Sequence, residues 1–152
     1  MGSNFLGYLY RSSRMGYRMR ISVLDIIDDY KYYIDFLCEH VKFIQDDIFK
    51  LQRSYDIVLC SHVIEHVPNP AEFVGRLREI SKGTLLVQAP FDEPVEGRTK
   101  GHINSFTMSD LEAMEPESIE LIESPAWGAF MEPRYKVFVA QFRGTDTSGV
   151  RG

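Results

Sequence analysis

The stretch of residues 55–70, which reads YDIVLCSHVIEHVPNP, constrains the fold of this chain more than any other. Residues 56–60 form a short apolar run with β-branched side chains and no polar alternation, which is typical of a strand buried on both faces of a parallel sheet. Ser61 and His62 follow this strand, at the end where open α/β sheets bind their ligands. Pro70 then suits the first turn of a helix. The stretch therefore predicts a buried strand that carries polar side chains into a crevice.

Strands and helices alternate along most of the chain. Alternation predicts right-handed crossovers and a parallel sheet covered by helices, which is an α/β fold. The last two strands have no helix between them, so we expect a hairpin in which one strand runs antiparallel to the rest. The predicted strands are 20–26, 41–44, 56–60, 84–88, 119–122 and 136–142, and the predicted helices are 5–15, 30–39, 70–81 and 107–114.

The length of 152 residues predicts one domain, residues 1–143, followed by a flexible polar tail, residues 144–152. A net charge of −5 argues against nucleic acid as a partner, and no apolar run approaches the ~20 residues of a membrane span. Cys38 and Cys60 lie in apolar contexts, which favours reduced thiols and a cytoplasmic protein. Residues 1–20 are rich in arginine like a transit peptide, but a surface helix explains them better.

Two acids follow two of the predicted strands. Asp25 ends its strand, and a carboxylate there can accept hydrogen bonds from two neighbouring ribose hydroxyls. Asp47 ends the turn after the next strand and is placed to accept from an exocyclic amine such as that of adenine. Both acids have a simpler interpretation as polar residues of strand-end turns.

The order of these elements resembles the class I S-adenosylmethionine-dependent methyltransferases, and it is closest to the large group that has Glu-His-Val shortly after a strand like that of residues 56–60, as at residues 65–67. The resemblance covers about residues 23–142 and is specific over residues 55–70. It implies a three-layer Rossmann-like sheet and S-adenosyl-L-methionine as cofactor. By resemblance, the ribose would lie at Asp25 and Ile26, the adenine at Asp47 and Ile48, the methionine end at Ser61 and His62, and the acceptor at Pro90 and Phe91.

The chain departs from the family pattern before Asp25. The family's sheet begins with a strand and a glycine-rich turn, and only Gly2 stands as a remnant of that turn here. We therefore expect six strands instead of seven, weak cofactor binding, and a truncated relative, a homo-oligomer or a module completed by another chain. To avoid a gap in the sheet, we expect the strand at Val23 to pair directly with the strand at Ile57; a partner's strand or the N-terminal segment are the alternatives.

Two functions fit this sequence. The first is methyl transfer to an unidentified acceptor, for example a small molecule, with His62 and His102 as candidate catalytic bases. His102 lies in a long polar loop, residues 92–105, and an ordinary surface histidine is the alternative. The second function is a non-catalytic module that holds a nucleoside or a protein partner. A nicotinamide dehydrogenase shares the ribose acid, but no G-x-G-x-x-G precedes it.

A metal motif also needs consideration. Residues 62–66 fit H-x-x-E-H, the pattern of inverted zinc peptidases. That chemistry needs both histidines on one helical face and a third protein ligand. Here the motif follows a strand and meets Pro68 two residues later, which argues against a two-turn helix. The sequence therefore predicts no bound metal.

Overall fold

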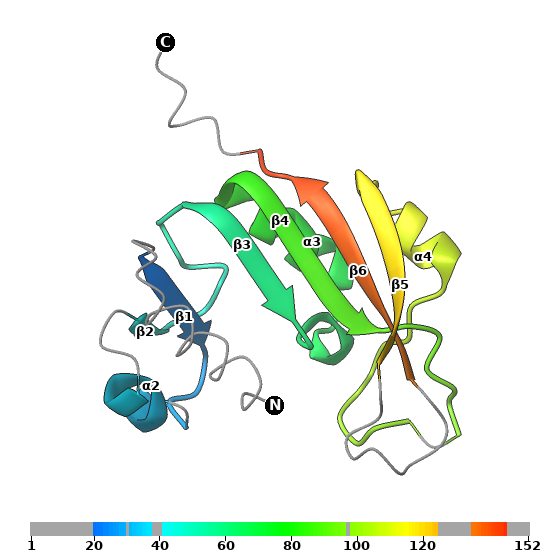
Figure 1. Cartoon of the computed structure of the whole chain (residues 1–152), viewed down its shortest axis with the longest axis horizontal. Helices are drawn as coiled ribbons and strands as arrows, with labels where there is room; N and C mark the ends of the chain where they lie inside the picture. The colour runs from blue at the N-terminus through cyan, green and yellow to red at the C-terminus, as the bar shows by residue number, and fades with distance from the viewer. Residues whose placement is uncertain (1–19, 30, 38–40, 97, 125–134, 146–152) are drawn as a thin grey trace. The chain divides into compact units, whose positions relative to one another are not determined.

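The computed structural model describes residues 20–29, 31–37, 41–96, 98–124 and 135–145. They belong to two compact units, Met1–Leu51 and Gln52–Gly152, and each is described by itself (Figure 1). The predicted helix at 5–15, Gly2 and most of the tail lie outside the described residues. The single domain over residues 1–143 stays a prediction.

The first unit is a strand–helix–strand element. It contains β1 (Ile21–Asp25), α2 (Lys31–Leu37) and β2 (Val41–Gln45). The two strands pair in parallel along their whole length. Ile34 of α2 and Val41 of β2 are buried in one small cluster, which holds the helix on the strands.

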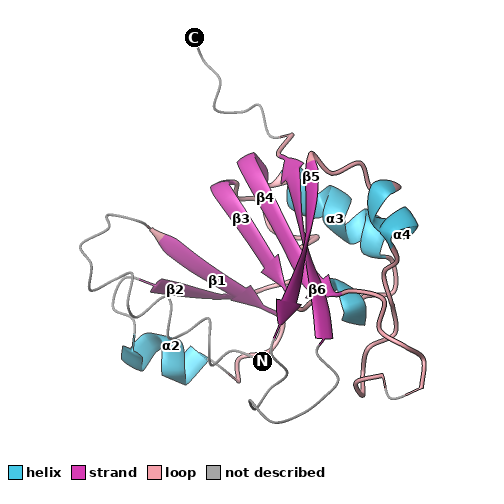
Figure 2. Ribbon diagram, turned by 45° about the vertical axis from the view of Figure 1, so that its right-hand side comes forward, coloured by secondary structure: helices cyan, strands magenta, loops and turns pink. Residues whose placement is uncertain are grey.

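The second unit contains most of the described elements. Its sheet has the order β3-β4-β6-β5, in which β3 and β4 are parallel and β6 is antiparallel to both of its neighbours (Figure 2). The predicted hairpin and its one reversed strand are therefore confirmed. The elements are β3 (Tyr55–Ser61), η1 (Ile64–His66), α3 (Pro70–Glu79), β4 (Ser81–Pro90), α4 (Met108–Glu112), β5 (Ser118–Ser124) and β6 (Tyr135–Arg143).

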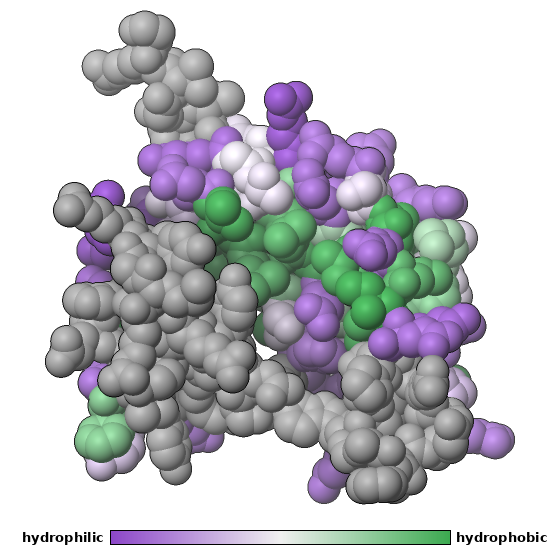
Figure 3. Space-filling view, in the orientation of Figure 1, coloured by the Kyte–Doolittle hydropathy of each residue, from purple (hydrophilic) through white to green (hydrophobic). Residues whose placement is uncertain are grey.

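The core of this unit lies between the central strands and α3, which covers one face of the sheet (Figures 1 and 2). Alternate residues of β4 and β6 are buried, as the period of two along a strand requires. Val74 and Leu77 of α3 are buried as well. On the other side of the sheet, which Figure 3 shows as a hydrophobic area, Ile57 and Leu59 of β3 are exposed by 67% and 48%.

The chain enters α3 as the sequence predicts. Pro70 occupies the first turn, and the side chain of Asn69 accepts a hydrogen bond from the Glu72 N–H at 3.3 Å. This cap satisfies one of the free N–H groups at the helix start. The long strand β4 follows directly, and it fixes where the next polar loop begins.

The described residues contain six strands, β1 to β6, which agrees with the predicted number. Within the first unit β1 pairs with β2, and within the second unit β3 pairs with β4. The pairing of β1 with β3 that we expected would join the two units, and it stays a prediction.

Candidate functional site

The chain turns sharply where β3 ends. The His62 N–H donates to the Gln88 carbonyl at 2.8 Å, which extends the parallel pairing by one residue. His62 then has a φ of 54°, in the left-handed region that only a few per cent of non-glycine residues adopt. This conformation costs of order 1 kcal/mol. The turn leads directly into η1, so the polar side chains of His62, Glu65 and His66 all follow closely on the carboxyl end of β3.

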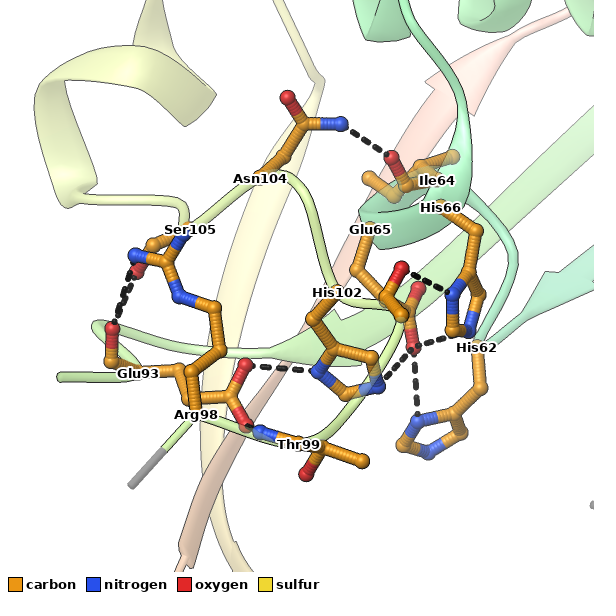
Figure 4. Close-up of polar contacts among 11 residues, drawn as sticks. His62, Ile64, Glu65, His66, Glu93, Arg98, Thr99, His102, Asn104 and Ser105 are labelled. Carbon is orange, nitrogen blue, oxygen red and sulfur yellow. Dashed lines mark hydrogen bonds and ion pairs between the residues drawn. The ribbon is translucent and has the colours of Figure 1, made fainter. Parts of the chain in front are cut away.

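Glu65 of η1 is the centre of the polar cluster at this strand end. The residue is 1% exposed. Three imidazole nitrogens surround its Oε1 atom: Nδ1 of His62 at 3.2 Å, Nε2 of His66 at 3.9 Å and Nε2 of His102 at 3.9 Å (Figure 4). Neither carboxylate oxygen has a hydrogen-bond partner within the described part of the chain. A buried carboxylate without a hydrogen bond is costly, so this cluster calls for a chemical explanation.

His102 comes to the cluster from the loop after β4, and Asn104 holds that loop against η1. The Asn104 Nδ2 group donates to the carbonyls of Ile64 at 3.1 Å and Val67 at 2.7 Å. Its backbone N–H donates to the Glu65 carbonyl at 3.1 Å. The loop that the sequence left without structure is therefore fixed by hydrogen bonds to the turn after β3.

Two hydrogen bonds orient the histidines of the cluster. Nδ1 of His66 lies 2.9 Å from the Gly101 carbonyl oxygen, and Nδ1 of His102 lies 2.6 Å from Glu93 Oε2. A carbonyl only accepts, so Nδ1 of His66 carries the proton and Nε2 faces Glu65. Gly101 has a φ of 96°, which favours glycine, so its carbonyl position depends on that residue.

Glu93 is held as a carboxylate. Burial raises the pKa of Glu93, but hydrogen bonds from the Thr99 backbone, from His102 and from the Thr99 side chain outweigh it, so the pKa is lowered overall. Its side chain is 2% exposed. Cys60 is different: burial, and then the charge of Glu65, raise the pKa of this thiol to about 12. Cys60 is thus a protonated core residue at neutral pH, as the sequence indicates.

The strand-end acids of the first unit make local contacts. Asp25 Oδ1 accepts from the Ile27 N–H at 3.2 Å, and Asp47 Oδ1 accepts from the Phe49 N–H at 3.0 Å. The Asp46 N–H also donates to the Asp25 carbonyl at 3.1 Å, which joins the ends of β1 and β2. Of the two isoleucines that the resemblance implicates, Ile26 is 71% exposed and Ile48 is 7% exposed.

The structure therefore brings Asp25 and Asp47 to adjacent strand ends of the first unit, and His62 and His102 to one cluster of the second. His102 is not a surface residue, because its side chain is 8% exposed. The sequence argument missed Glu93 and Asn104. Their only sequence signal is a position in a long polar loop after a buried strand.

Comparison with known proteins now bears on these two strand-end groups. The model of a family described as "Methyltransferase domain" matches residues 23–114. This match covers more than half of the chain, and the chain belongs to that family. No curated protein matches the sequence.

Solved structures agree with this fold. A magnesium protoporphyrin IX methyltransferase from Synechocystis PCC 6803, with SAH bound, has a TM-score of 0.61 at 12% identity, over 90% of this chain and 69% of its own. A putative methyltransferase from Bacillus halodurans has a TM-score of 0.64 at 16% identity, over 84% of each chain. The cyclase SpnF has a TM-score of 0.63 at 13% identity, over 90% of this chain and 69% of its own. At these identities the likeness shows the fold, and the cyclase shows that the fold does not fix the reaction.

No described helix is both long enough and apolar enough to cross a bilayer.

Proposed function

We propose that this chain binds S-adenosylmethionine and catalyses methyl transfer to an acceptor. The observation that carries the proposal is the family match over residues 23–114, which contains both strand-end acids and the His62–Glu65 turn. Similar structures support it, since the magnesium protoporphyrin IX methyltransferase was solved both with SAH and with SAM.

The acids of the first unit suit a nucleoside. Asp25 is partly buried, and the N–H of Ile27 occupies only its Oδ1 atom. A carboxylate has lone pairs for further donors, so Oδ2 is placed to accept from ribose hydroxyls. We assign the adenine to Asp47 and Ile48, and the methionine end to Ser61 and His62. Ile26 and Gly2 complete the proposed cofactor set.

The bound cofactor would supply an electrophilic methyl group. The methyl would depart from the sulfonium sulfur as the acceptor atom attacks in line, and a neutral thioether would remain. The chain's own contribution is to hold the two reactants in that geometry and to exclude other orientations. A base completes the reaction where the acceptor loses a proton. His62 is the better candidate for this base, since its side chain is 31% exposed whereas His102 is 8% exposed and hydrogen-bonded to Glu93.

Calorimetry with S-adenosylhomocysteine tests the proposal. We expect weak binding by the full chain. We expect Asp25→Ala to make the binding free energy less favourable by about 1.5–3 kcal/mol, the range for hydrogen bonds to a charged group. Asp28→Ala is the control, because Asp28 is an exposed acid of the same loop. Equal binding by Asp25→Ala and the full chain would contradict the ribose assignment, and no binding at millimolar ligand would contradict the function. Binding without methyl turnover for any acceptor favours the alternative of a binding module.

A further inference from the structure

The starting point is the charge balance around Glu65. Its carboxylate is 1% exposed and neither oxygen accepts a hydrogen bond from any described residue. Nδ1 of His62 lies 3.2 Å from Oε1 of Glu65. The Nε2 atoms of His66 and His102 each lie 3.9 Å from the same oxygen, which exceeds hydrogen-bond length. His66 Nε2 is itself buried without a partner. The Glu65 carboxylate and the Nε2 atom of His66 thus face each other at 3.9 Å without a hydrogen bond.

The fixed tautomers define what can fill that space. The Gly101 carbonyl and the Glu93 carboxylate accept from the Nδ1 atoms of His66 and His102. In the neutral rings, each Nε2 therefore presents a lone pair, and both lone pairs face the Glu65 oxygen (Figure 4). Lone pairs and a carboxylate repel one another unless a cation lies between them.

The distances suit a metal cation. The ligand atoms of Glu65, His66 and His102 lie within 4.8 Å of one another. In a tetrahedral site with metal–ligand bonds of 2.0–2.2 Å, the ligand atoms are roughly 3.4 Å apart. The Glu65–histidine distances of 3.9 Å need only a small side-chain rotation to reach this value.

The outer contacts have the form that metal sites require. A metal-binding histidine usually donates its other N–H to a carboxylate or a backbone carbonyl, which fixes the ring and raises its basicity. His102 donates to a carboxylate and His66 to a carbonyl. The His66 and His102 rings also meet edge to face, with centroids 4.8 Å apart.

We propose that Glu65, His66 and His102 bind one divalent transition-metal ion, with zinc as the best match. Two imidazoles and one carboxylate suit zinc, whereas magnesium and calcium prefer oxygen ligands throughout. Three protein ligands leave a coordination position for water or for an oxygen of a second ligand. His62 lies beside Oε1 of Glu65 but outside the set of three mutually close ligand atoms.

This site differs from the peptidase pattern that the sequence argument rejected. In an inverted zinc peptidase the glutamate of H-x-x-E-H is a base and both histidines are ligands. Here Glu65 is a ligand, and the second histidine is His102 from a distant loop. The proposal does not depend on methyl transfer or on cofactor binding, because all of its residues and contacts lie in the second unit.

Metal binding by the full chain tests the site. After treatment with a chelator, the protein is titrated with Co²⁺, whose visible absorption reports coordination by nitrogen and oxygen ligands, and then with Zn²⁺ as a competitor. We expect about one equivalent of each ion and displacement of cobalt by zinc. Glu65→Gln and His102→Gln should each weaken binding by more than about tenfold. His62→Gln and Glu120→Gln, which changes an exposed residue of β5, should keep the metal.

A second variant covers failure to fold. Glu93→Gln keeps an acceptor for His102 but removes the charge behind it, and we expect about 10- to 100-fold weaker zinc binding with an unchanged circular dichroism spectrum. Zinc should also raise the melting temperature of the full chain and not that of folded Glu65→Gln. Binding of less than about a tenth of an equivalent of zinc by the full chain would overturn the proposal. Glu93→Gln and folded Glu65→Gln variants that bind zinc as tightly as the full chain would overturn it as well.

Discussion

The two groups of strand-end residues in this chain differ in how their polar atoms are satisfied. In the first unit, Asp25 and Asp47 accept hydrogen bonds from backbone N–H groups two residues further on. In the second unit, the Glu65 carboxylate is buried, accepts no hydrogen bond from the described residues, and is surrounded by histidines from two segments. The first arrangement follows from local sequence, and the second depends on tertiary structure. We therefore expect the first to tolerate substitution and the second to depend on its supporting residues.

The largest expected effect is at the core that supports the histidine cluster. Phe138 of β6 is fully buried, and its ring meets Phe106, at the end of the His102 loop, edge to face at 5.6 Å. Phe138→Ala should lower the free energy of unfolding by about 3–5 kcal/mol, because it leaves a cavity. Urea denaturation measures this loss. Phe36→Ala is the matched control in the first unit: Phe36 is 73% exposed, and its loss should change stability by less than about 0.5 kcal/mol.

A loss below about 1 kcal/mol for Phe138→Ala would contradict the comparison. It would mean that the buried Phe138 contributes little more to the free energy of unfolding than the exposed Phe36 does.

The loop contact should have the next largest effect. Asn104→Ala removes the donor to the carbonyls of Ile64 and Val67, and a buried acceptor left without a donor costs about 1–3 kcal/mol. Hydrogen exchange of the loop amides should become faster together with this loss. Ser105→Ala serves as control, since it removes one hydrogen bond to the Glu93 carbonyl and no contact to η1. Equal effects of the two variants would show that Asn104 does not hold the loop.

Much of this fold was predictable because its signals are local. The apolar run before Cys60, the proline at position 70 and the alternation of elements place the strands and helices to within a few residues. The histidine cluster was only half visible. His62, Glu65 and His66 stand in one motif, but His102 joins them only because Asn104 and the Glu93 hydrogen bond fold the loop back. No periodicity encodes such a contact between segments.

The same local signals do not extend to the pairing of β1 with β3. We expected these two strands to pair, because an open gap in a sheet is costly, and this pairing between the two units stays a prediction. Pairing of β1 with β2 is encoded by the short helix between them, as in any strand–helix–strand element. No local signal in β3 selects a second neighbour, since its apolar run suits any parallel partner.

A smaller effect is expected at the start of α4, which begins with a capping box. The Thr107 side chain accepts from the Asp110 N–H, and Asp110 accepts from the Thr107 N–H. Thr107→Ala should cost about 1 kcal/mol at pH 7. The hydrogen bonds from the Thr107 side chain and then its backbone lower the pKa of Asp110 from its ordinary value of 3.8.

The sign of the pH dependence follows from this lowered pKa. A carboxylate with a lowered pKa stabilises the folded state above its unfolded pKa, and this contribution is lost as the pH falls through the folded value. The destabilisation by Thr107→Ala should therefore shrink as the pH falls below about 3.8, the ordinary pKa, and vanish only below the lowered folded pKa, where Asp110 is protonated in both states. Because Asp110 is exposed, solvent screening keeps the change small. Thermal melts of the unchanged chain and of Thr107→Ala at pH 7 and at acidic pH test it. An equal difference in melting temperature at both pH values would exclude the capping carboxylate as the cause.

The smallest expected effect, and the sharpest contrast with Glu65, is the stability of Asp25→Ala. The Asp25 side chain accepts one N–H, that of Ile27, near the surface of the first unit, and water can replace the lost acceptor. The free energy of unfolding should therefore change by no more than about 0.5 kcal/mol. Measured beside the calorimetry proposed above, an unchanged stability with a lost affinity for S-adenosylhomocysteine assigns the carboxylate to ligand binding. A destabilisation above about 1.5 kcal/mol would instead make Asp25 a structural residue. The difference between the two strand ends would then lie in burial alone, and the ribose assignment would lose its basis.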